Sequence, residues 1–308
     1  MKIAVMAPGG VGGYFGGRLA DAGHDVTFIA RGANLEAIRQ SGLRVTSPLG
    51  DIHLTAPSVT DDAAEIGPVD IVLFAVKLNA MEAAAEACRP LIGPETAVVP
   101  FLNGVDAPAI LAEVLGADHA CGGVTYISAH IEGPGHIGHI GDFAKLVFGE
   151  MDGSMSDRLD ALQRACADSG IDATLTPEIE VALWEKFSLL VPMSGMTAAA
   201  RSPLGVIRSD PMGRHVFEAC MRETVAVGIA KGIPLADDLV DRQMSLFNGL
   251  PDEMKASMLV DLEAERPLEA PWLSGAVARM GRELGVPTPV NDTLFAAMQP
   301  FVMGRPGD

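Results

Sequence analysis

The chain has 308 residues, 48% hydrophobic and 20% charged, so it is long enough for two domains with sizeable cores, and its composition excludes gross disorder. The formal net charge of −18 argues against nucleic acid and anionic membranes as general partners, and it requires local cations at any site for an anionic ligand. Four widely spaced cysteines without a C-x-x-C pair indicate free thiols. Because the sequence shows neither a signal peptide nor an apolar run of membrane-spanning length, we expect a soluble, cytoplasmic protein.

The N-terminal segment has the pattern of a buried strand, a glycine turn and the start of a helix. Residues 3–6 form a short apolar run, and glycines follow at once. In dinucleotide-binding folds such a turn brings the backbone close to a pyrophosphate, whose charge is met by N–H groups at the helix start. We therefore predict that Gly9, Gly10, Val11 and Gly12 bind a cofactor. A tight strand–helix turn without a ligand is the alternative interpretation.

The turn departs from the G-x-G-x-x-G pattern at its first position, where Ala7 stands before Pro8. A residue that precedes proline favours extended dihedrals, so we expect Ala7 to be extended. Pro8 itself offers no N–H group. Both changes raise the question of how strongly this turn binds a pyrophosphate.

A second strand is predicted over residues 25–30, and Arg31 and Gly32 follow it. Folds that bind NAD usually carry an acidic residue at the end of this strand, where it accepts a hydrogen bond from the ribose 2′-OH. A cation at this position suits a 2′-phosphate, so Arg31 predicts NADP(H) rather than NAD(H). The alternative is a solvated charge at a strand end.

The next segments complete a predicted parallel sheet. Residues 34–41 are typical of a helix, residues 43–47 and 51–56 of a hairpin or two short strands, and residues 70–76 and 95–102 of buried parallel strands. Lys77 and Asn103 come at the carboxyl ends of the last two strands, where doubly wound sheets bind their ligands. We therefore predict that both contact a cofactor or a substrate. A lysine extended to solvent and an Asn-Gly turn are the alternatives.

Residues 122–149 alternate short β-like runs with glycines and contain three histidines, His130, His136 and His139. These lie among turns, with no cysteine nearby and no helical i, i+4 pair, so we do not predict a metal site. A helix over residues 157–169 and a strand over 172–175 follow.

A domain boundary is predicted at residues 176–178, Thr-Pro-Glu, a good helix start. Further helices are expected over residues 211–232, 236–247, 251–265, 271–284 and 289–303. The predicted fold is therefore α/β, with a Rossmann-type dinucleotide-binding domain over residues 1–176 followed by an all-α domain over residues 177–308.

Lys186 is a candidate catalytic residue, because it is the only cation in a long apolar stretch of the helix that starts at residue 177. A partly desolvated lysine has a lowered pKa and can donate a proton near neutrality. Helical spacing places Leu190 and Ser194 on its face. Pairing with Glu180 or Glu185 is the plain structural alternative.

A second group of polar residues lies further along the chain. Ser257 and Asp261 are spaced i, i+4 on a predicted helix, and Glu269 follows near the start of the next one. Together these side chains can hold a small hydroxylated carboxylic acid whose reactive oxygen faces Lys186.

Over its whole length the sequence resembles the ketopantoate reductases (2-dehydropantoate 2-reductases). The matching motifs are the glycine turn, Ala30-Arg31-Gly32, Val76-Lys77, Asn103-Gly104, Trp184-x-Lys186, Ser257-Met258-x-x-Asp261, Arg266-Pro267-x-Glu269 and Ser274-Gly275. The resemblance implies NADPH-dependent reduction of a 2-oxo acid to the 2-hydroxy acid, that is, ketopantoate to pantoate in pantothenate and coenzyme A biosynthesis.

The resemblance also implies roles for single residues. Lys186 would be the general acid, and Glu269 would orient both the lysine and the substrate. Ser257 and Asn103 would contact the substrate, and Asp261 would support the site. The cofactor contacts would include Gly9, Gly12, Arg31 and Lys77.

Three positions depart from the family pattern, because Leu190, Ser194 and Ser274 stand where asparagine is common. The substrate is therefore less firmly indicated than the reaction type. An NADPH-dependent reductase of another small 2-oxo acid or ketone, and a non-catalytic NADP(H)-binding sensor, remain as alternatives. A homodimer formed through the helical domain is compatible with the sequence.

Overall fold

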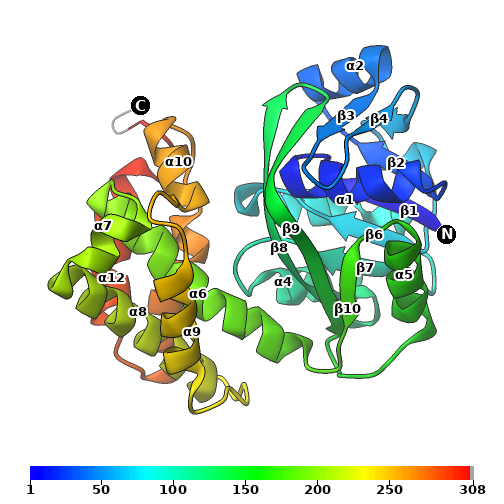
Figure 1. Ribbon diagram of the computed structural model, residues 1–308. Coiled ribbons are helices and arrows are strands. Elements are labelled where there is room, and N and C mark those ends of the chain that lie inside the picture. The colour runs from blue at the N-terminus through cyan, green and yellow to red at the C-terminus, as the bar shows by residue number, and fades with distance from the viewer. Residues whose placement is uncertain (306–308) are drawn as a thin grey trace. The chain divides into compact units, whose positions relative to one another are not determined.

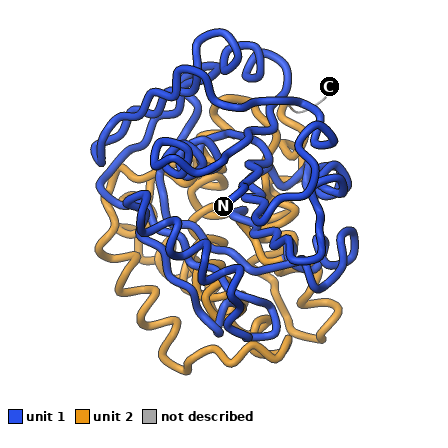
Figure 2. The backbone as a smooth tube through the Cα atoms, turned by 90° about the vertical axis from the view of Figure 1, so that its right-hand side faces the viewer, with its two compact units in different colours: residues 1–102, 106–179 blue, residues 103–105, 180–308 orange. Residues whose placement is uncertain are grey.

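The computed structural model describes residues 1–305, and the chain divides into two compact units (Figures 1 and 2). The first unit comprises residues 1–102 and 106–179. The second begins again at residue 180 and also contains residues 103–105. This short loop therefore belongs to the second unit, although the chain on either side of it belongs to the first.

A parallel five-stranded sheet forms the centre of the first unit. Its strands, in spatial order, are β5 (Ser58–Thr60), β2 (Asp25–Ile29), β1 (Lys2–Met6), β6 (Ile71–Phe74) and β7 (Ala97–Pro100). Numbered by occurrence within the sheet, this order is 3-2-1-4-5, that of dinucleotide-binding folds. The Rossmann-type prediction is confirmed. The order reverses between β1 and β6, so the carboxyl ends of these strands mark the expected ligand crevice.

The same unit also contains a second sheet, in which parallel and antiparallel pairs are mixed. Its members are β10 (Asp172–Leu175), β9 (His136–Glu150), β3 (Leu43–Thr46) and β4 (Ile52–Leu54), with β8 (Cys121–Gly133) paired antiparallel to β9. The pairing of β3 with β4 confirms the hairpin prediction. The β8–β9 ribbon is longer than the short runs predicted from the sequence, because all of its glycines except Gly135 lie within the strands.

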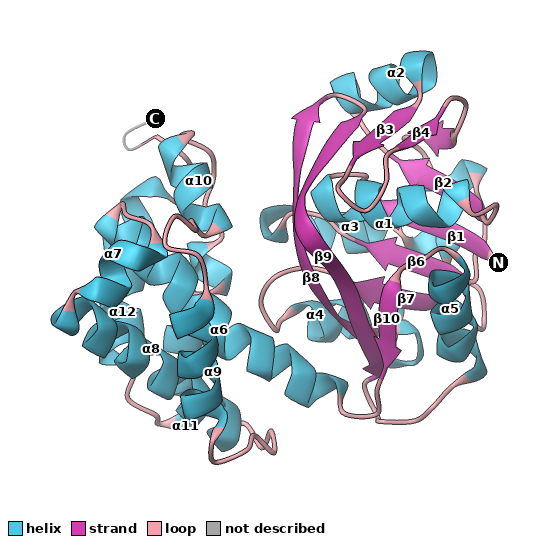
Figure 3. Cartoon of the chain, viewed as in Figure 1, coloured by secondary structure: helices cyan, strands magenta, loops and turns pink. Residues whose placement is uncertain are grey.

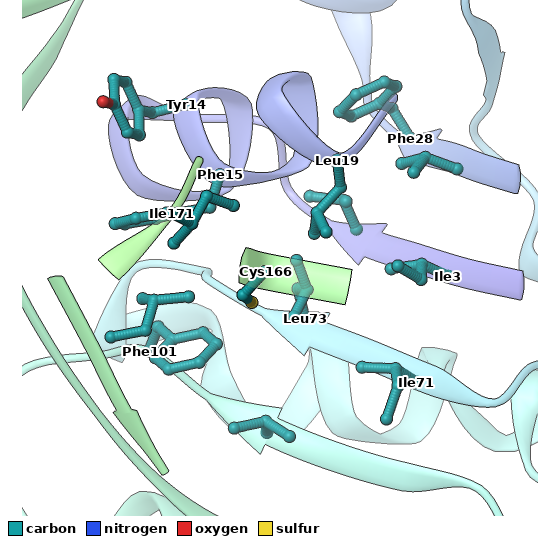
Figure 4. Packing of buried hydrophobic residues seen from close by; sticks show 14 of the residues in the cluster. Ile3, Tyr14, Phe15, Leu19, Phe28, Ile71, Leu73, Phe101, Cys166 and Ile171 are labelled. Carbon is teal, nitrogen blue, oxygen red and sulfur yellow. The ribbon is translucent and has the colours of Figure 1, made fainter. Parts of the chain in front are cut away.

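The helices of the first unit are α1 (Gly10–Asp21), α2 (Gly32–Ser41), α3 (Met81–Ala87), α4 (Ala107–Leu115) and α5 (Asp157–Asp168). Short 3₁₀ turns occur at Ala63–Glu65, Leu78–Ala80, Arg89–Leu91 and Ala117–His119. Figure 4 shows Phe15 and Leu19 of α1 directed toward the strands that carry Ile3, Ile71 and Leu73. All five side chains are buried, so this core fixes the start of α1 over the carboxyl end of β1.

Ala7, the residue between β1 and the glycine turn, contradicts the expectation of an extended backbone. Its φ is +67°, the left-handed conformation that glycine adopts most easily. Two backbone bonds hold it there: its N–H donates to Ile29 O at 3.2 Å, and its carbonyl accepts from Gly9 N at 2.8 Å. The strain costs on the order of 1 kcal/mol, which the bonds of the turn and the packing of α1 offset.

The described part of the second unit, residues 103–105 and 180–305, consists of helices joined by loops and contains no strand (Figure 3). Its helices are α6 (Ile179–Ala200), α7 (Leu204–Ser209), α8 (Pro211–Ala230), α9 (Leu239–Gly249), α10 (Ser257–Glu263), α11 (Ser274–Leu284) and α12 (Pro289–Met298), with 3₁₀ turns at Ala270–Trp272 (η5) and Gln299–Phe301. In the core, Trp184 meets Phe187 edge-on, and Phe217 stacks on Phe247. Within residues 1–305 no helix is both long and apolar enough to cross a bilayer.

The helix predicted over residues 251–265 is shorter in the structure, where α10 begins at Ser257. The preceding residues form a turn whose carbonyl groups bond to another helix: Met254 O accepts from Leu204 N, and Asp252 O accepts from Gly205 N. These tertiary bonds use acceptors that a longer helix would need, so they override the local helical pattern. After α10, Glu265 adopts a φ of +54°, which stops the helix.

Candidate functional site

Three side chains of the second unit form one hydrogen-bonded chain. Lys186 Nζ on α6 donates to Asn103 Oδ1 at 3.3 Å, and Asn103 Nδ2 donates to Glu269 Oε2 at 3.2 Å. The amide therefore turns its carbonyl to a cation and its NH₂ to a carboxylate, which is the orientation that electrostatics favours. All three side chains are partly buried. Sequence reasoning selected each of them but did not predict that Asn103 bridges the other two.

Gly104 explains how the loop of residues 103–105 reaches this position. Its φ is +83°, and a Cβ added there would lie 3.2 Å from the carbonyl oxygen of Trp272 in η5. Glycine thus supplies both the backbone conformation and the close approach. Val105 packs against the core of the second unit, and Glu269 immediately precedes η5. The Asn-Gly pair was the only sequence signal for this arrangement.

The ammonium group of Lys186 has an altered acidity. Burial lowers the pKa of Lys186 to about 8, because desolvation disfavours the charged form. The Glu269 carboxylate acts in the opposite direction and raises the pKa of the lysine. The ammonium is therefore the main form at neutral pH, and it can release its proton more easily than an exposed lysine.

Glu185, one of the two carboxylates considered as alternative partners of Lys186, pairs with an arginine of another helix. Glu185 Oε1 accepts from Arg242 Nη2 at 2.9 Å, and the Glu185 carbonyl accepts from Gln243 Nε2 at 2.9 Å. Glu185 thus ties α6 to α9, and Glu269 is the carboxylate that acts on the lysine.

Ser257 and Asp261 lie on α10, but their surroundings differ. Ser257 is the first residue of that helix and is exposed. Asp261 is buried and accepts from Arg266 Nε at 2.7 Å. Asp261 thus holds the chain segment that leads from α10 toward Glu269, which fits a supporting role.

The glycines of the turn in the first unit differ in what surrounds them. A Cβ on Gly12 would lie 2.5 Å from Ala7 O, and one on Gly10 would lie 2.6 Å from Ala129 O, so both positions are closed by the protein itself. A Cβ on Gly9 would meet only the Ile131 side chain, at 4.0 Å. Packing within the protein therefore accounts for Gly10 and Gly12, whereas the bare backbone at Gly9 leaves room for a ligand.

The backbone of α1 also supplies donors at this turn. The first i to i−4 bond of the helix runs from Gly13 N to Gly9 O at 2.7 Å. The N–H groups of residues 10–12 precede this ladder, so they are the free donors of the helix start. Val11 is one of these residues and packs partly against the core of the unit. Free amides beside an open backbone suit a pyrophosphate.

Two cations follow β2 and β6, the strands on either side of β1 in the same unit. Arg31 follows β2, is exposed and is the residue before α2. Lys77 is exposed three residues beyond the end of β6, the strand next to β1. Both positions agree with the ligand crevice expected from the strand order.

The three histidines have protein partners. His139 lies between Ser47 Oγ at 2.8 Å and Phe143 O at 3.0 Å, whereas His136 contacts Thr46 Oγ1 at 2.8 Å and Glu132. Among residues 1–305 no group of three or more His, Cys, Asp or Glu side chains is arranged to hold a metal ion. All four cysteines are buried and unbridged.

Comparison with known proteins identifies the family. The model for Ketopantoate reductase PanE/ApbA matches residues 3–153, and that for Ketopantoate reductase PanE/ApbA C terminal matches residues 178–301. The chain belongs to the ketopantoate reductase family. A 2-dehydropantoate 2-reductase of Mesorhizobium japonicum is 30% identical, with 99% of each chain covered, and the Uncharacterized oxidoreductase YkpB of Bacillus subtilis is also 30% identical, with 98% of this chain and 99% of that protein covered.

Solved structures show the same relationship. A PanE/ApbA family ketopantoate reductase from Ralstonia eutropha has a TM-score of 0.90 at 30% identity, with 98% of each chain covered. A 2-dehydropantoate 2-reductase from Geobacter metallireducens has the same TM-score and identity, over 97% of this chain and 99% of that one. As a member of this NADPH-dependent family, the chain is an oxidoreductase that acts on a CH–OH group with NADP(H).

The three positions that depart from the family pattern lie in the second unit. Leu190 is partly buried and packs against the helical core. Ser194 and Ser274 are almost fully buried, and neither hydroxyl has a hydrogen-bond partner among the described residues. Their burial shows that replacing asparagine by smaller side chains here changes interior positions, not the surface.

The contrast between Gly9 and Gly12 leads to a test of the glycine turn. Gly9→Ala should leave the free energy of unfolding within about 0.5 kcal/mol, because φ is −82° and no protein atom is close, but NADPH affinity should fall by roughly tenfold or more. Gly12→Ala should instead lower the free energy of unfolding by about 1–3 kcal/mol through overpacking. Thermal denaturation and NADPH titration of both variants provide the measurements. Unchanged NADPH affinity in Gly9→Ala would contradict a ligand at this turn.

Proposed function

We propose that the chain reduces ketopantoate to pantoate with NADPH, the reductive step of pantothenate biosynthesis, and that Lys186 donates the proton. The observation that carries this proposal is the bonded chain of Lys186, Asn103 and Glu269, together with the pKa of about 8 for the lysine. Family relatives at about 30% identity are named for the same reaction, which supports the substrate assignment.

NADPH, when bound, supplies the hydride that is added to the ketone carbon. We assign its binding to the amides of residues 10–12, to Arg31 for the 2′-phosphate and to Lys77. The open backbone of Gly9 fits the pyrophosphate. These residues bind and orient, and they carry no part of the redox chemistry.

The residues of the second unit control the charge that develops on the ketone oxygen. The Lys186 ammonium stabilises this oxygen and transfers a proton to it, so that the C=O bond becomes a CH–OH group and the lysine becomes neutral. Solvent then returns the proton to the lysine. Asn103 fixes the position of Nζ, and Glu269 keeps the ammonium charged despite its burial. Ser257 is assigned to a substrate oxygen.

The first test concerns the choice of cofactor. Wild-type enzyme should use NADPH far better than NADH, and Arg31→Asp should weaken NADPH binding by about 10- to 100-fold, because a charge-assisted bond is replaced by repulsion. Steady-state kinetics with both cofactors measure the change. Arg39→Asp is a matched control, because it makes the same charge change at an exposed arginine of α2, the helix that follows Arg31, where Arg39 pairs with Glu36. Equal use of NADPH and NADH by the wild type would contradict the role of Arg31.

The second test concerns proton donation. Because the ammonium is the acid, kcat/KM for ketone reduction should fall as pH rises through about 8, the pKa of Lys186. Lys186→Ala should lower turnover by roughly 10²-fold or more while NADPH binding stays nearly intact. Lys231→Ala, at an exposed lysine of the same unit, should change neither quantity.

The variant Glu269→Gln tests the contribution of the carboxylate while the lysine is kept. The Glu269 charge raises the pKa of Lys186, so its removal should shift the alkaline limb of the pH profile to lower pH and reduce turnover. Wild-type rates in Lys186→Ala would show that the lysine is structural. An unshifted limb in Glu269→Gln would remove the carboxylate from the mechanism.

The third test concerns the substrate. Asparagine side chains at positions 190 and 194 could pair with the distal hydroxyl of ketopantoate, and this chain has Leu190 and Ser194 instead. Apolar pockets separate near-isosteres by only about 10- to 200-fold per group. We therefore expect ketopantoate reduction with loose selectivity against 2-oxoisovalerate, which lacks that hydroxyl, and a sharper preference for ketopantoate in Leu190→Asn.

The ratio of kcat/KM for the two acids in wild type and Leu190→Asn is the deciding measurement. Leu189→Asn is the control, since it places the same amide one residue away on α6 at a similarly half-buried site. An unchanged ratio in Leu190→Asn would refute the role of Leu190. Activity on neither acid would favour reduction of another 2-oxo acid or ketone.

A further inference from the structure

We infer that Asn34 is a positioning residue that holds the glycine turn against the start of α2 and thereby strengthens the preference for NADPH. The inference rests on the cofactor site proposed above. Asn34 lies in the first turn of α2, three residues after Arg31. It therefore occupies the element that follows the proposed 2′-phosphate contact, beside the turn proposed for the pyrophosphate.

Both ends of the Asn34 amide are used within the first unit. Its Nδ2 donates to the carbonyl of Pro8 at 3.3 Å, and its Oδ1 accepts from the backbone N–H of Gly135 at 2.8 Å. The amide thus joins α2, the glycine turn and the tip of the β8–β9 hairpin. Because Nδ2 and Oδ1 each have a protein partner, one of them in the turn itself, we assign to Asn34 an action on the cofactor through the turn.

The Pro8 carbonyl is a point where the turn needs support. Ala7 on one side has the strained φ of +67°, and Pro8 has no N–H with which to bond to a neighbour. The turn has its own backbone bonds from Ala7 N to Ile29 O and from Gly9 N to Ala7 O. The Asn34 bond adds a side-chain tether at the residue between them.

Gly135, which binds Asn34 Oδ1, is itself held in place by backbone contacts. Its carbonyl accepts from Arg44 N at 2.8 Å at the start of the pairing between β3 and β9, and a Cβ added to it would lie 3.1 Å from Gly42 O. The hairpin tip is therefore packed against the end of α2. With Oδ1 held by the Gly135 N–H, Nδ2 is directed toward Pro8, so little side-chain freedom is lost when a cofactor binds.

The consequence differs between the two nicotinamide cofactors. NADPH must reach the free amides of residues 10–12 and Arg31 together, and these lie on two separate elements whose spacing the Asn34 tether helps to fix. NADH lacks the 2′-phosphate and does not need that spacing. Loss of the tether should therefore weaken NADPH binding more than NADH binding, because two points of attachment must be matched at once.

The test is a titration of the full-length protein with NADPH and with NADH, followed by cofactor fluorescence, in wild type, Asn34→Ala and Gln40→Ala. Asn34→Ala should raise the Kd for NADPH by about tenfold, the scale for two neutral hydrogen bonds, and the Kd for NADH by no more than about threefold. The kcat at saturating NADPH should stay at the wild-type value. Gln40→Ala removes an exposed amide from the same helix and should leave both affinities unchanged.

Each other outcome has a definite meaning. A lower Tm with unchanged Kd values, or equal weakening of NADPH and NADH, would overturn the inference and leave Asn34 a structural residue. Failure of the wild type to bind NADPH would instead contradict the proposed cofactor site. If Asn34→Ala does not fold, Asn34→Ser repeats the test, since its hydroxyl remains polar but is too short to span both partners.

Discussion

Burial of a single ammonium group sets the main constraint on the second unit. Moving a lysine out of water favours its neutral form, so burial lowers the pKa of Lys186 and opposes the charge that a proton donor needs. The Glu269 carboxylate opposes this effect, and the resulting pKa of about 8 keeps the group protonated at neutral pH. Asn103 connects the lysine to the carboxylate. Its carbonyl oxygen accepts from the cation and its NH₂ group donates to the anion, so reversing the amide would be unfavourable.

This constraint explains why segments far apart in sequence must meet. Lys186 comes from a long helix, Glu269 from the residue before a 3₁₀ turn, and Asn103 from a loop of three residues that belongs to the second unit. Gly104 favours the approach of this loop to η5, because its φ is positive and a Cβ there would lie 3.2 Å from the Trp272 carbonyl oxygen. Asp261 and Arg266 stabilise the connection that leads to Glu269. The position of Lys186 Nζ therefore depends on contacts from three segments that are far apart in the sequence.

Local patterns predicted most of the helices and strands but not the tertiary hydrogen bonds between them. Apolar runs located β1, β2, β6 and β7 but not the edge strand β5, which is only three residues long, and β10 has the predicted limits of residues 172–175. The expectation for Ala7 was wrong because the preference of a pre-proline residue is local, whereas bonds to Ile29 and Gly9 decide its conformation. The amide of Asn103 was correctly placed after a strand, but its bridging role depends on a contact across 166 positions, which no spacing rule encodes.

The departure at Ala7 shows which parts of a glycine turn can change. A left-handed φ costs alanine about 1 kcal/mol, so the conformational role of the first glycine can be carried by another small residue when neighbouring bonds offset the strain. The steric role of Gly12 cannot be carried in this way, because a Cβ would lie 2.5 Å from the Ala7 carbonyl oxygen. Gly9 differs again, since the protein would tolerate a Cβ there. A deviation from the motif at position 7 therefore removes neither the free amides of residues 10–12 nor the open backbone beside them, and these are the features that a pyrophosphate requires.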